Sequence, residues 1–435
     1  MTSSFPRDAA DHAGSFVRGF ARAMVRCGHH VDVLAPEPAD DVRPPSEPGI
    51  DVHHVPYFRP RAWQRTFYGA GAPENLGRDP RAWLGVLPFA LAMRRAVAAR
   101  AQRWDAVVSH WALPGGLLAG HVLGPTECEA VKPHLVVCHS ADVHVLDRIP
   151  GGAWVARAVT ERASSLLFVS ADLRDRWLSM LGPIGGAQAA VRCHVSPMGI
   201  ERPSEATCGR REARRSWRMT RFTIVTLGRL VPVKGLDVLL DATAGRKDLE
   251  VIVAGEGPER ARLERLAARR GVNCRFVGVV HGDAKQRLLA GADVMAVPSR
   301  VLPSGRTEGT PVAMLEGMRA GLPVIASAVG GIASLVERRG AALLVEPDDA
   351  GELARAIDAL RRSADVRRRI ARAGCAVARS LEWDRLAGQL LRLIAPVLPP
   401  TAHGATDARL WGTSQRTSSA PSLGAGGSYG APPRS

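Results

Sequence analysis

The sequence predicts an α/β protein built from two Rossmann-like domains, each a doubly wound parallel sheet with helices on both faces. The chain has 435 residues, whereas a single hydrophobic core stops growing at roughly 250–300 residues. Short apolar runs alternate with helical patterns in two successive series, which is typical of parallel sheets covered by helices. A polar, strongly basic stretch separates the two series and is interpreted as a linker, residues 201–221.

The first series predicts an N-terminal domain over residues 1–200. Its strands are expected at 30–35, 51–55, 105–109, 135–138, 166–170 and 191–196, with helical patterns between them. Residues 37–80 are rich in Pro, Gly and Arg, which favours an irregular excursion. A doubly wound domain needs a buried central first strand, but turn-like residues follow Met1 almost at once. We therefore expect the first strand to be truncated.

The second series predicts a C-terminal domain over residues 222–380. Its strands are expected at 223–227, 250–254, 274–277, 294–297, 324–326 and 343–345, and its helices at 236–243, 259–269, 311–320 and 351–361. Two more helical stretches follow at 366–378 and 383–394, and the second belongs to a closing segment over 381–397. Residues 398–435 are rich in Gly, Ser, Pro and Ala and are predicted to be disordered.

Composition and charge indicate which classes of protein this chain can belong to. Hydrophobic residues make up 46% of the chain and charged residues 23%, as in a folded globular protein. No apolar run reaches the roughly 18 residues of a membrane-spanning helix, and no secretory signal is evident, so a cytoplasmic protein is expected. The net charge of +16 comes almost entirely from Arg and leaves peripheral contact with the anionic inner face of the cytoplasmic membrane open. Aromatic residues, at 5%, are too sparse for a nucleic-acid binder.

The seven cysteines are scattered along the chain, and no pair has C-x-x-C spacing. Neither a disulfide framework nor a zinc cage is therefore indicated. We expect isolated thiols in a reducing compartment.

The stretch from Pro298 to Gly331 carries the most informative chemistry. Glu308 and Glu316 have seven residues between them, and Pro311 follows the first. Because proline favours the first helical turn, Glu308 should lie in a loop and Glu316 inside a helix whose free N–H groups suit a phosphate. Eight residue steps span about 12 Å along a helix, whereas a retaining glycosidase needs its carboxyl groups about 5 Å apart. The two glutamates are expected to touch different parts of one extended ligand; one capping and one solvated glutamate is the alternative.

Four segments in order resemble a known family. Glu308-x7-Glu316, followed by G-x-P-V-I-A-S-x-x-G-G, is similar to the retaining GT-B nucleotide-sugar glycosyltransferases of glycosyltransferase family 4, or group 1. The segment 228–235 resembles that family's G-R-L-x-x-x-K-G loop, 253–258 its strand-end glycine turn, and 276–279 its base-contacting loop. The resemblance implies a GT-B fold, in which two Rossmann-like domains face a central cleft and the closing helix packs back on the N-terminal domain.

The resemblance also implies roles on the donor side. Arg229 and Lys234 would hold the diphosphate together with backbone N–H groups around Gly309 and Thr310, because fixed cations stabilise the charge that grows on a departing diphosphate. Further along the donor, Glu316 would bond the ribose hydroxyls and Val279 would lie against the base. Glu308 would be catalytic and contact the donor sugar near the reacting carbon, as a base, an electrostatic stabiliser or a positioning group. No D-x-D string occurs in the chain, so no metal is expected at this site. A surface-exposed basic turn is the alternative for the loop with Arg229.

The N-terminal half resembles the family in two strand-end segments, 104–116 and 138–142. Open α/β sheets bind ligands at the carboxyl ends of strands. The family's catalytic-site histidine corresponds to His139, with a strand-end residue bonded to backbone as the alternative. His110 and Asp142 are candidates for contact with the sugar or the acceptor, and Gly14 corresponds to the glycine-rich loop after the first strand.

These residues together predict a retaining glycosyltransferase that moves a sugar from a nucleotide-diphosphate donor to an acceptor of unknown identity. The acceptor could be a glycan, a lipid-linked molecule or a small molecule. No cofactor is expected beyond the nucleotide-sugar itself. The alternatives are a nucleotide-sugar hydrolase or epimerase on the same fold, and an inactive nucleotide-sugar-binding homologue.

Overall fold

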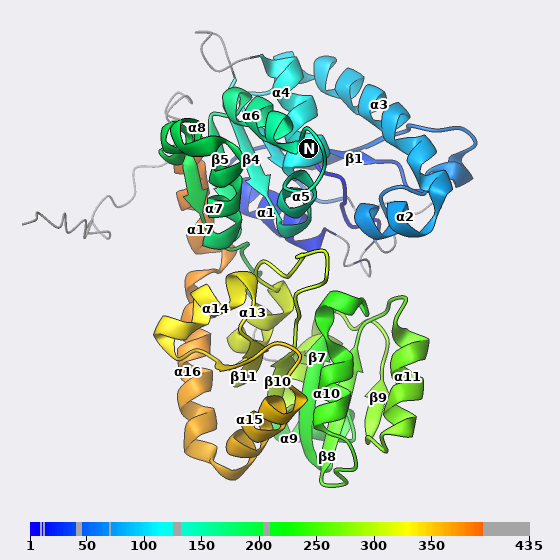
Figure 1. The fold of residues 1–435 in the computed structure, drawn as a ribbon, viewed down its shortest axis with the longest axis vertical. Helices are drawn as coiled ribbons and strands as arrows, with labels where there is room; N and C mark the ends of the chain where they lie inside the picture. The colour runs from blue at the N-terminus through cyan, green and yellow to red at the C-terminus, as the bar shows by residue number, and fades with distance from the viewer. Residues whose placement is uncertain are drawn as a thin grey trace, which may run out of the picture. The chain divides into compact units, whose positions relative to one another are not determined.

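A computed structural model describes residues 1–8, 11, 14–40, 46–68, 71–124, 132–202 and 209–394. The predicted disordered segment 398–435 lies outside these ranges. We refer to the sheets and helices before residue 203 as the N-terminal lobe and to those from 209 to 380 as the C-terminal lobe (Figure 1). All twelve predicted strands form, each with ends within two residues of those expected.

The strands of the N-terminal lobe are parallel and fall into two sheets. One pairs β1 with β2, and the other has the order β3-β4-β5-β6. Their bounds are β1 Val31–Pro36, β2 Ile50–Val55, β3 Val107–His110, β4 His134–Cys138, β5 Ser165–Phe168 and β6 Cys193–Val195. The backbone of residues 1 and 2 bonds to both sheets, because Thr2 N–H donates to Leu34 O and His110 N–H donates to Met1 O. These two residues lie where the sequence predicted a truncated strand.

Eight helices accompany these strands within the described part of the lobe. They are α1 Ser15–Arg26, α2 Ala72–Arg78, α3 Val86–Ala98, α4 Leu117–Leu123, α5 Ser140–Leu146, α6 Gly152–Arg162, α7 Ala171–Met180 and α8 Gly182–Ala190. Short turns of other helix types occur as η1 Arg61–Trp63, η2 Pro80–Gly85, η3 Ala101–Arg103 and η4 Ala112–Gly116. The expectation of irregular structure over residues 37–80 is therefore wrong in part, because α2 forms there in addition to the predicted β2.

The C-terminal lobe contains one six-stranded parallel sheet with the order β12-β11-β10-β7-β8-β9. The strands are β7 Phe222–Leu227, β8 Leu249–Ala254, β9 Cys274–Phe276, β10 Val294–Val297, β11 Val324–Ser327 and β12 Leu343–Val345. Apolar side chains of α10 (Leu236–Ala242), α11 (Arg260–Arg269) and α15 (Ala350–Arg362) pack on one face. The other face packs against α12 (Gly282–Gly291), α13 (Val312–Arg319) and α14 (Gly330–Val336), with η6 Glu337–Arg339 after α14. Burial on both faces explains why β10 is apolar throughout, and why β8 and β11 each contain only one polar residue, Glu250 and Ser327.

Part of the predicted linker over residues 201–221 forms a helix. Residues Arg210–Ser216 form the helix α9, and the side chains of Arg210 and Arg214 pair with Asp293 at 2.6 and 2.9 Å. These arginines neutralise a carboxylate that immediately precedes β10, so α9 belongs to the C-terminal lobe. Sequence alone showed only a basic stretch, because the acidic partner lies about 80 residues away.

The chain finally returns to the N-terminal lobe through α16 (Ala364–Ser380) and α17 (Trp383–Ile394). Trp383 is buried, its ring lies 5.9 Å from that of Phe20 in α1, and Ile200 pairs with Glu382 as a bridge. The packing of α17 on α1 agrees with the closing helix that the resemblance implied. Among the described helices, none combines the length and apolarity that crossing a membrane requires.

Candidate active site

The candidate donor site lies at the carboxyl ends of β7 and β10, where two loops meet the start of α13. The first loop contains the turn η5 (Pro232–Lys234) and ends at Gly235, whose φ of 60° favours glycine. A Cβ on Gly235 would overlap the carbonyl oxygen of Pro298 in the second loop. This close approach of the two loops sets the position of Lys234.

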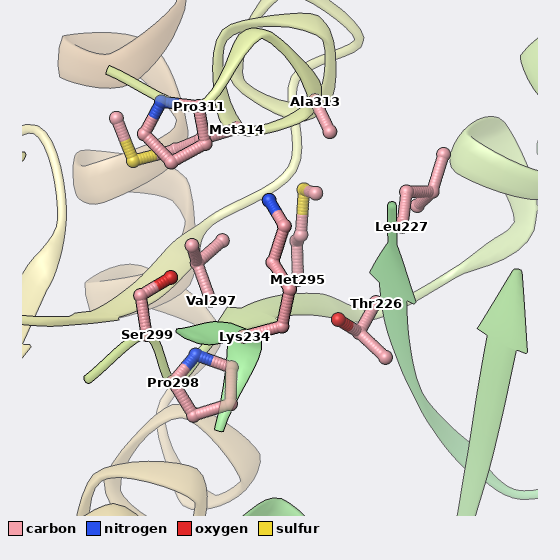
Figure 2. A pocket seen from close by; sticks show the side chains of 10 residues that line it. All are labelled: Thr226, Leu227, Lys234, Met295, Val297, Pro298, Ser299, Pro311, Ala313 and Met314. Carbon is pink, nitrogen blue, oxygen red and sulfur yellow. The ribbon is translucent and has the colours of Figure 1, made fainter. Parts of the chain in front are cut away.

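Lys234 and Glu308 form the central ion pair of this site. The Nζ atom of Lys234 lies 2.8 Å from Oε1 and 2.9 Å from Oε2 of Glu308, and both side chains are largely buried. A small pocket surrounds Lys234 and is lined by Thr226, Leu227, Met295, Val297, Pro298, Ser299, Pro311, Ala313 and Met314. Figure 2 shows the Lys234 amine directed toward the residues that begin α13. Glu308 lies in the loop before α13 and Glu316 within the helix, as predicted.

Glu316 forms a second ion pair, which the sequence did not predict. Its Oε1 atom lies 2.8 Å from Nζ of Lys285 in α12. The chain has only four lysines, and two of them contact the two glutamates of the motif. The scarcity of lysine in an arginine-rich chain was the one signal that could have singled out Lys285.

The guanidinium of Arg229 lies close to Gly71 of the N-terminal lobe. If Gly71 had a Cβ atom, that atom would lie 3.1 Å from Nη1 of Arg229 and 3.6 Å from Oε2 of Glu74. Glu74 also pairs with Arg306 of the loop before α13. The sequence did not predict the pair of Glu74 and Arg306, because these residues are 232 positions apart.

His139 precedes α5 in the N-terminal lobe and is half-buried among aromatic rings. Its ring centroid lies 4.9 Å from those of Phe16 and Trp111 and 5.5 Å from that of His110. Nδ1 of His110 and Nε2 of His139 are 3.3 Å apart, so one of them donates to the other. Burial lowers the pKa of His139 to about 3. The ring is therefore neutral at ordinary pH and can exchange hydrogen bonds with a sugar hydroxyl.

His110 and Asp142 lie deeper than the sequence suggested. His110 is 2% exposed, and burial followed by the neighbouring His139 keeps its pKa well below the usual range. The carboxylate of Asp142 is buried and accepts hydrogen bonds from the N–H groups of Ala112 (2.7 Å) and Val143 (3.0 Å). Burial raises the pKa of Asp142 to about 7. These bonds hold the loop after β3 against α5; contact of Asp142 with the sugar or the acceptor stays a prediction.

The loop that contains Glu308 contacts the N-terminal lobe on both sides of that residue. Ser140 Oγ donates to Thr307 O at 2.5 Å, and Thr310 Oγ1 donates to Val169 O at 3.4 Å. A Cβ on Gly309 would lie 2.7 Å from Val169 Cγ2, which explains the glycine there. The backbone at residues 309 and 310, predicted to bind phosphate, is thus held against Val169, directly after β5.

Two other predicted residues have simpler surroundings. Gly14 precedes α1 with a φ of 72°, and a Cβ there would overlap Ser4 O, so the backbone geometry requires glycine. Val279 follows β9 and is 37% exposed, so its side chain is accessible to a base.

Comparisons with known proteins show which family this chain resembles. The family described as Glycosyl transferases group 1 matches residues 210–376, and the Glycosyl transferase 4-like domain matches residues 13–191. Together the two matches cover both lobes. The chain belongs to the group 1 glycosyltransferases. The family predicted from the sequence motifs is thereby confirmed.

Two relatives of this glycosyltransferase have names that contain an inositol compound. It is 32% identical over 255 residues to the GDP-mannose-dependent alpha-(1-6)-phosphatidylinositol monomannoside mannosyltransferase of Mycobacterium tuberculosis, over 56% of this chain. The match spans 64% of that relative's length, which is under two thirds. It is 29% identical to a D-inositol 3-phosphate glycosyltransferase of Geodermatophilus obscurus, over 90% of this chain and 86% of the relative.

Solved structures with the same fold confirm the GT-B prediction. The trehalose-6-phosphate synthase OtsA matches with a TM-score of 0.71 at 15% identity, over 92% of this chain and 99% of that one. Sucrose-phosphate synthase from Thermosynechococcus elongatus matches with a TM-score of 0.67 at 21% identity, over 87% and 92%. Anabaena HepE in complex with UDP and glucose matches with a TM-score of 0.65 at 19% identity, over 91% and 100%.

Proposed function

We propose that this protein transfers a sugar from a nucleoside diphosphate donor to an acceptor hydroxyl, with retention of anomeric configuration and without a metal ion. The observation that carries this proposal is the Lys234–Glu308 pair of 2.8 Å at the start of α13. It puts a cation suited to phosphate next to a carboxylate suited to a sugar. Membership in the group 1 glycosyltransferases supports the same reaction class.

The leaving diphosphate is the group that needs stabilisation. As the bond to the anomeric carbon breaks, negative charge grows on the phosphate oxygen, and a preorganised cation stabilises that state more than the ground state. Lys234 would exchange its contact with Glu308 for a phosphate oxygen, while the N–H groups at the start of α13 supply further donors. By the family resemblance, Arg229 would supply a second cation to the same phosphate.

Release from Lys234 would leave the Glu308 carboxylate facing the donor sugar. The leaving phosphate oxygen would accept the proton of the acceptor hydroxyl on the same face of the sugar, which retains the configuration. His139, held neutral by burial, would hydrogen-bond a sugar hydroxyl from the N-terminal lobe. Glu316 would bond the ribose hydroxyls, with Lys285 orienting its carboxylate.

The printed names of similar proteins suggest which donors and acceptors to test. One relative is named for GDP-mannose and a phosphatidylinositol mannoside, and others are named for D-inositol 3-phosphate. The Anabaena neighbour is described with UDP and with UDP-glucose. We propose a nucleoside diphosphate hexose as donor and an inositol-bearing or other polyol acceptor.

We propose contact with an anionic membrane surface at η2 and α3. Trp83, Leu84, Leu87 and Leu91 are large apolar side chains that are 45–68% exposed. Residues 80–104 contain five arginines and no acidic residue. An apolar stripe beside unopposed arginines suits the boundary between anionic headgroups and acyl chains. Binding to phosphatidylglycerol vesicles should exceed binding to phosphatidylcholine vesicles.

That surface is tested by sedimentation with vesicles. Leu87→Ser with Leu91→Ser should reduce vesicle binding several-fold. Ile184→Ser, which changes a 77%-exposed apolar residue elsewhere, should leave it unchanged. Equal loss in both variants, or no preference for anionic lipid, would contradict a membrane contact at α3.

The reaction is tested with a panel of UDP-, GDP-, ADP- and dTDP-sugars and the polyol acceptors, with chelator present. Thermal shifts identify the nucleotide, because a ligand that binds the folded state raises its Tm. Product analysis by NMR then gives the anomeric configuration. Free sugar or an epimer formed at full rate without acceptor would instead identify a hydrolase or an epimerase. Binding without turnover of any mixture would identify an inactive homologue.

A further inference from the structure

We infer that His30, Asp32, Asp51 and His53 bind one divalent transition-metal ion, with zinc as the best-suited metal, at the amino ends of β1 and β2. The two strands carry mirror-image motifs, His30-x-Asp32 and Asp51-x-His53. The strands pair in parallel with Asp32 directly opposite Asp51. Nothing in the proposed sugar transfer uses these residues, because the donor and sugar groups lie at the carboxyl ends of strands.

All four side chains lie on one face of the strand pair. Side chains alternate along a strand, and Leu34 and Val55 both pack into the cluster that contains Phe89 and Met93 of α3. The residues two and four positions before them therefore face the same side. The alternation places both imidazoles and both carboxylates on this face, where His30 and Asp51 are exposed and His53 and Asp32 are partly buried.

The distances between ligand atoms already approach those of a metal site. His30 Nε2 lies 3.0 Å from Asp51 Oδ2 and 4.0 Å from Asp32 Oδ1, and His53 Nε2 lies 3.3 Å from Asp32 Oδ1. Zinc bonds of roughly 2.0–2.1 Å in a tetrahedron place ligand atoms about 3.3 Å apart. His30, Asp32 and Asp51 each offer a ligand atom within 4.8 Å of the other two. His53, which contacts Asp32, would complete the set by turning toward the same ion.

A neighbouring group already orients one ligand. The indole Nε1 of Trp104, just before β3, donates to Asp32 Oδ2 at 2.7 Å. This bond occupies one carboxylate oxygen and leaves Oδ1 directed at the histidines, as outer hydrogen bonds do in metal sites. Trp104 thereby links the site to the segment that leads into β3.

Charge and ligand type favour a transition metal over the alternatives. Carboxylates directly opposite on neighbouring strands repel each other, and a divalent cation removes this repulsion. Simple hydrogen bonds to the imidazoles are the competing explanation for the cluster. Two imidazole nitrogens select zinc, cobalt or nickel rather than magnesium or calcium, which prefer oxygen ligands throughout. Bound metal would clamp β1, β2 and Trp104 together and raise the Tm of the protein.

The test uses the full chain, freed of any affinity tag and stripped with a chelator. Zinc is then added, and both Tm and the bound zinc per chain are measured; cobalt gives a visible absorption band for tetrahedral coordination. His30→Ala with His53→Ala removes both imidazoles. His29→Ala with His121→Ala removes two other histidines of the same lobe and serves as the matched control.

The wild-type chain and the control should bind zinc and show a rise in Tm, whereas the His30/His53 variant should bind one equivalent fewer and lose that rise. Asp51→Asn, an exposed change that does not threaten folding, should weaken zinc binding at least tenfold. Equal zinc content and equal Tm shifts in the wild type, the Asp51→Asn variant and the His30/His53 variant would overturn the inference, as would a wild-type chain that binds no zinc.

Discussion

Ser140 donates a hydrogen bond of 2.5 Å to the carbonyl of Thr307. Ser140 directly follows His139, and Thr307 directly precedes Glu308. One hydrogen bond therefore joins the segments that carry the two residues proposed to contact the donor sugar. Its partners are 167 positions apart in the sequence, so the fold rather than local pattern brings them together.

Glu308→Gln is predicted to lower turnover by about a hundredfold or more, because the carboxylate that faces the sugar loses its charge. Nucleotide affinity should survive or rise, since Lys234 loses its anionic partner. Initial rates and calorimetric titration with the nucleoside diphosphate measure the two effects. Glu346→Gln, at an exposed position in the same lobe, is the control. Parallel loss of turnover and affinity would contradict this division of roles.

Arg229→Ala combined with Lys234→Ala is predicted to abolish both nucleotide-sugar binding and transfer. Two cations leave the region where the diphosphate is expected, and a charge-assisted contact is worth about 1.5–3 kcal/mol. Arg211→Ala with Lys247→Ala removes the same charges from exposed positions and should leave both properties intact. Retained activity in the first variant would remove the diphosphate role from these residues.

The sequence predicted the strands well because parallel strands buried on both faces are continuous apolar runs. It missed α14, which begins with Gly330 and Gly331, poor helix formers in isolation. Gly331 is needed there because a Cβ would lie 2.7 Å from Gly309 O and 2.8 Å from Ser170 Cβ. Tertiary contact therefore overrides local propensity at α14.

The sequence singled out Glu308, Glu316 and Lys234 as candidates because they stand in a family-like motif. It did not predict their partners, since Lys234 and Glu308 are 74 positions apart and Lys285 and Glu316 are 31 apart. Nothing in the sequence indicated that Asp142 would be buried. Its role depends on the Ala112 N–H group, which reaches it only once η4 has folded after β3.

Lowering the pH should destabilise the fold through His134. Burial lowers the pKa of His134 to about 4, whereas an unfolded histidine titrates near 6.5. Between these values the unfolded chain binds more protons, so the free energy of unfolding falls as pH drops from about 6.5 toward 4. The contribution of His134 between pH 8 and pH 5 is about 2 kcal/mol.

Urea unfolding of the wild type and of His134→Gln at several pH values isolates that contribution. The variant should lose less stability on acidification than the wild type, whereas His121→Gln, at an exposed site, should match the wild type. An unchanged pH dependence in His134→Gln would show that this residue is not the source of acid sensitivity.

Gly19→Ala is predicted to loosen the packing of α17 on α1. A Cβ at Gly19 would overlap Nε1 of the buried Trp383 side chain, and overpacking of this kind costs about 1–3 kcal/mol. Gly77→Ala in α2 is the matched control, because nothing lies within 4 Å of a Cβ there. In a helix, that second change should be neutral or stabilising by up to about 1 kcal/mol. Thermal and urea unfolding measure both variants; a Gly19→Ala protein as stable as the wild type would mean that the closing helix does not depend on this contact.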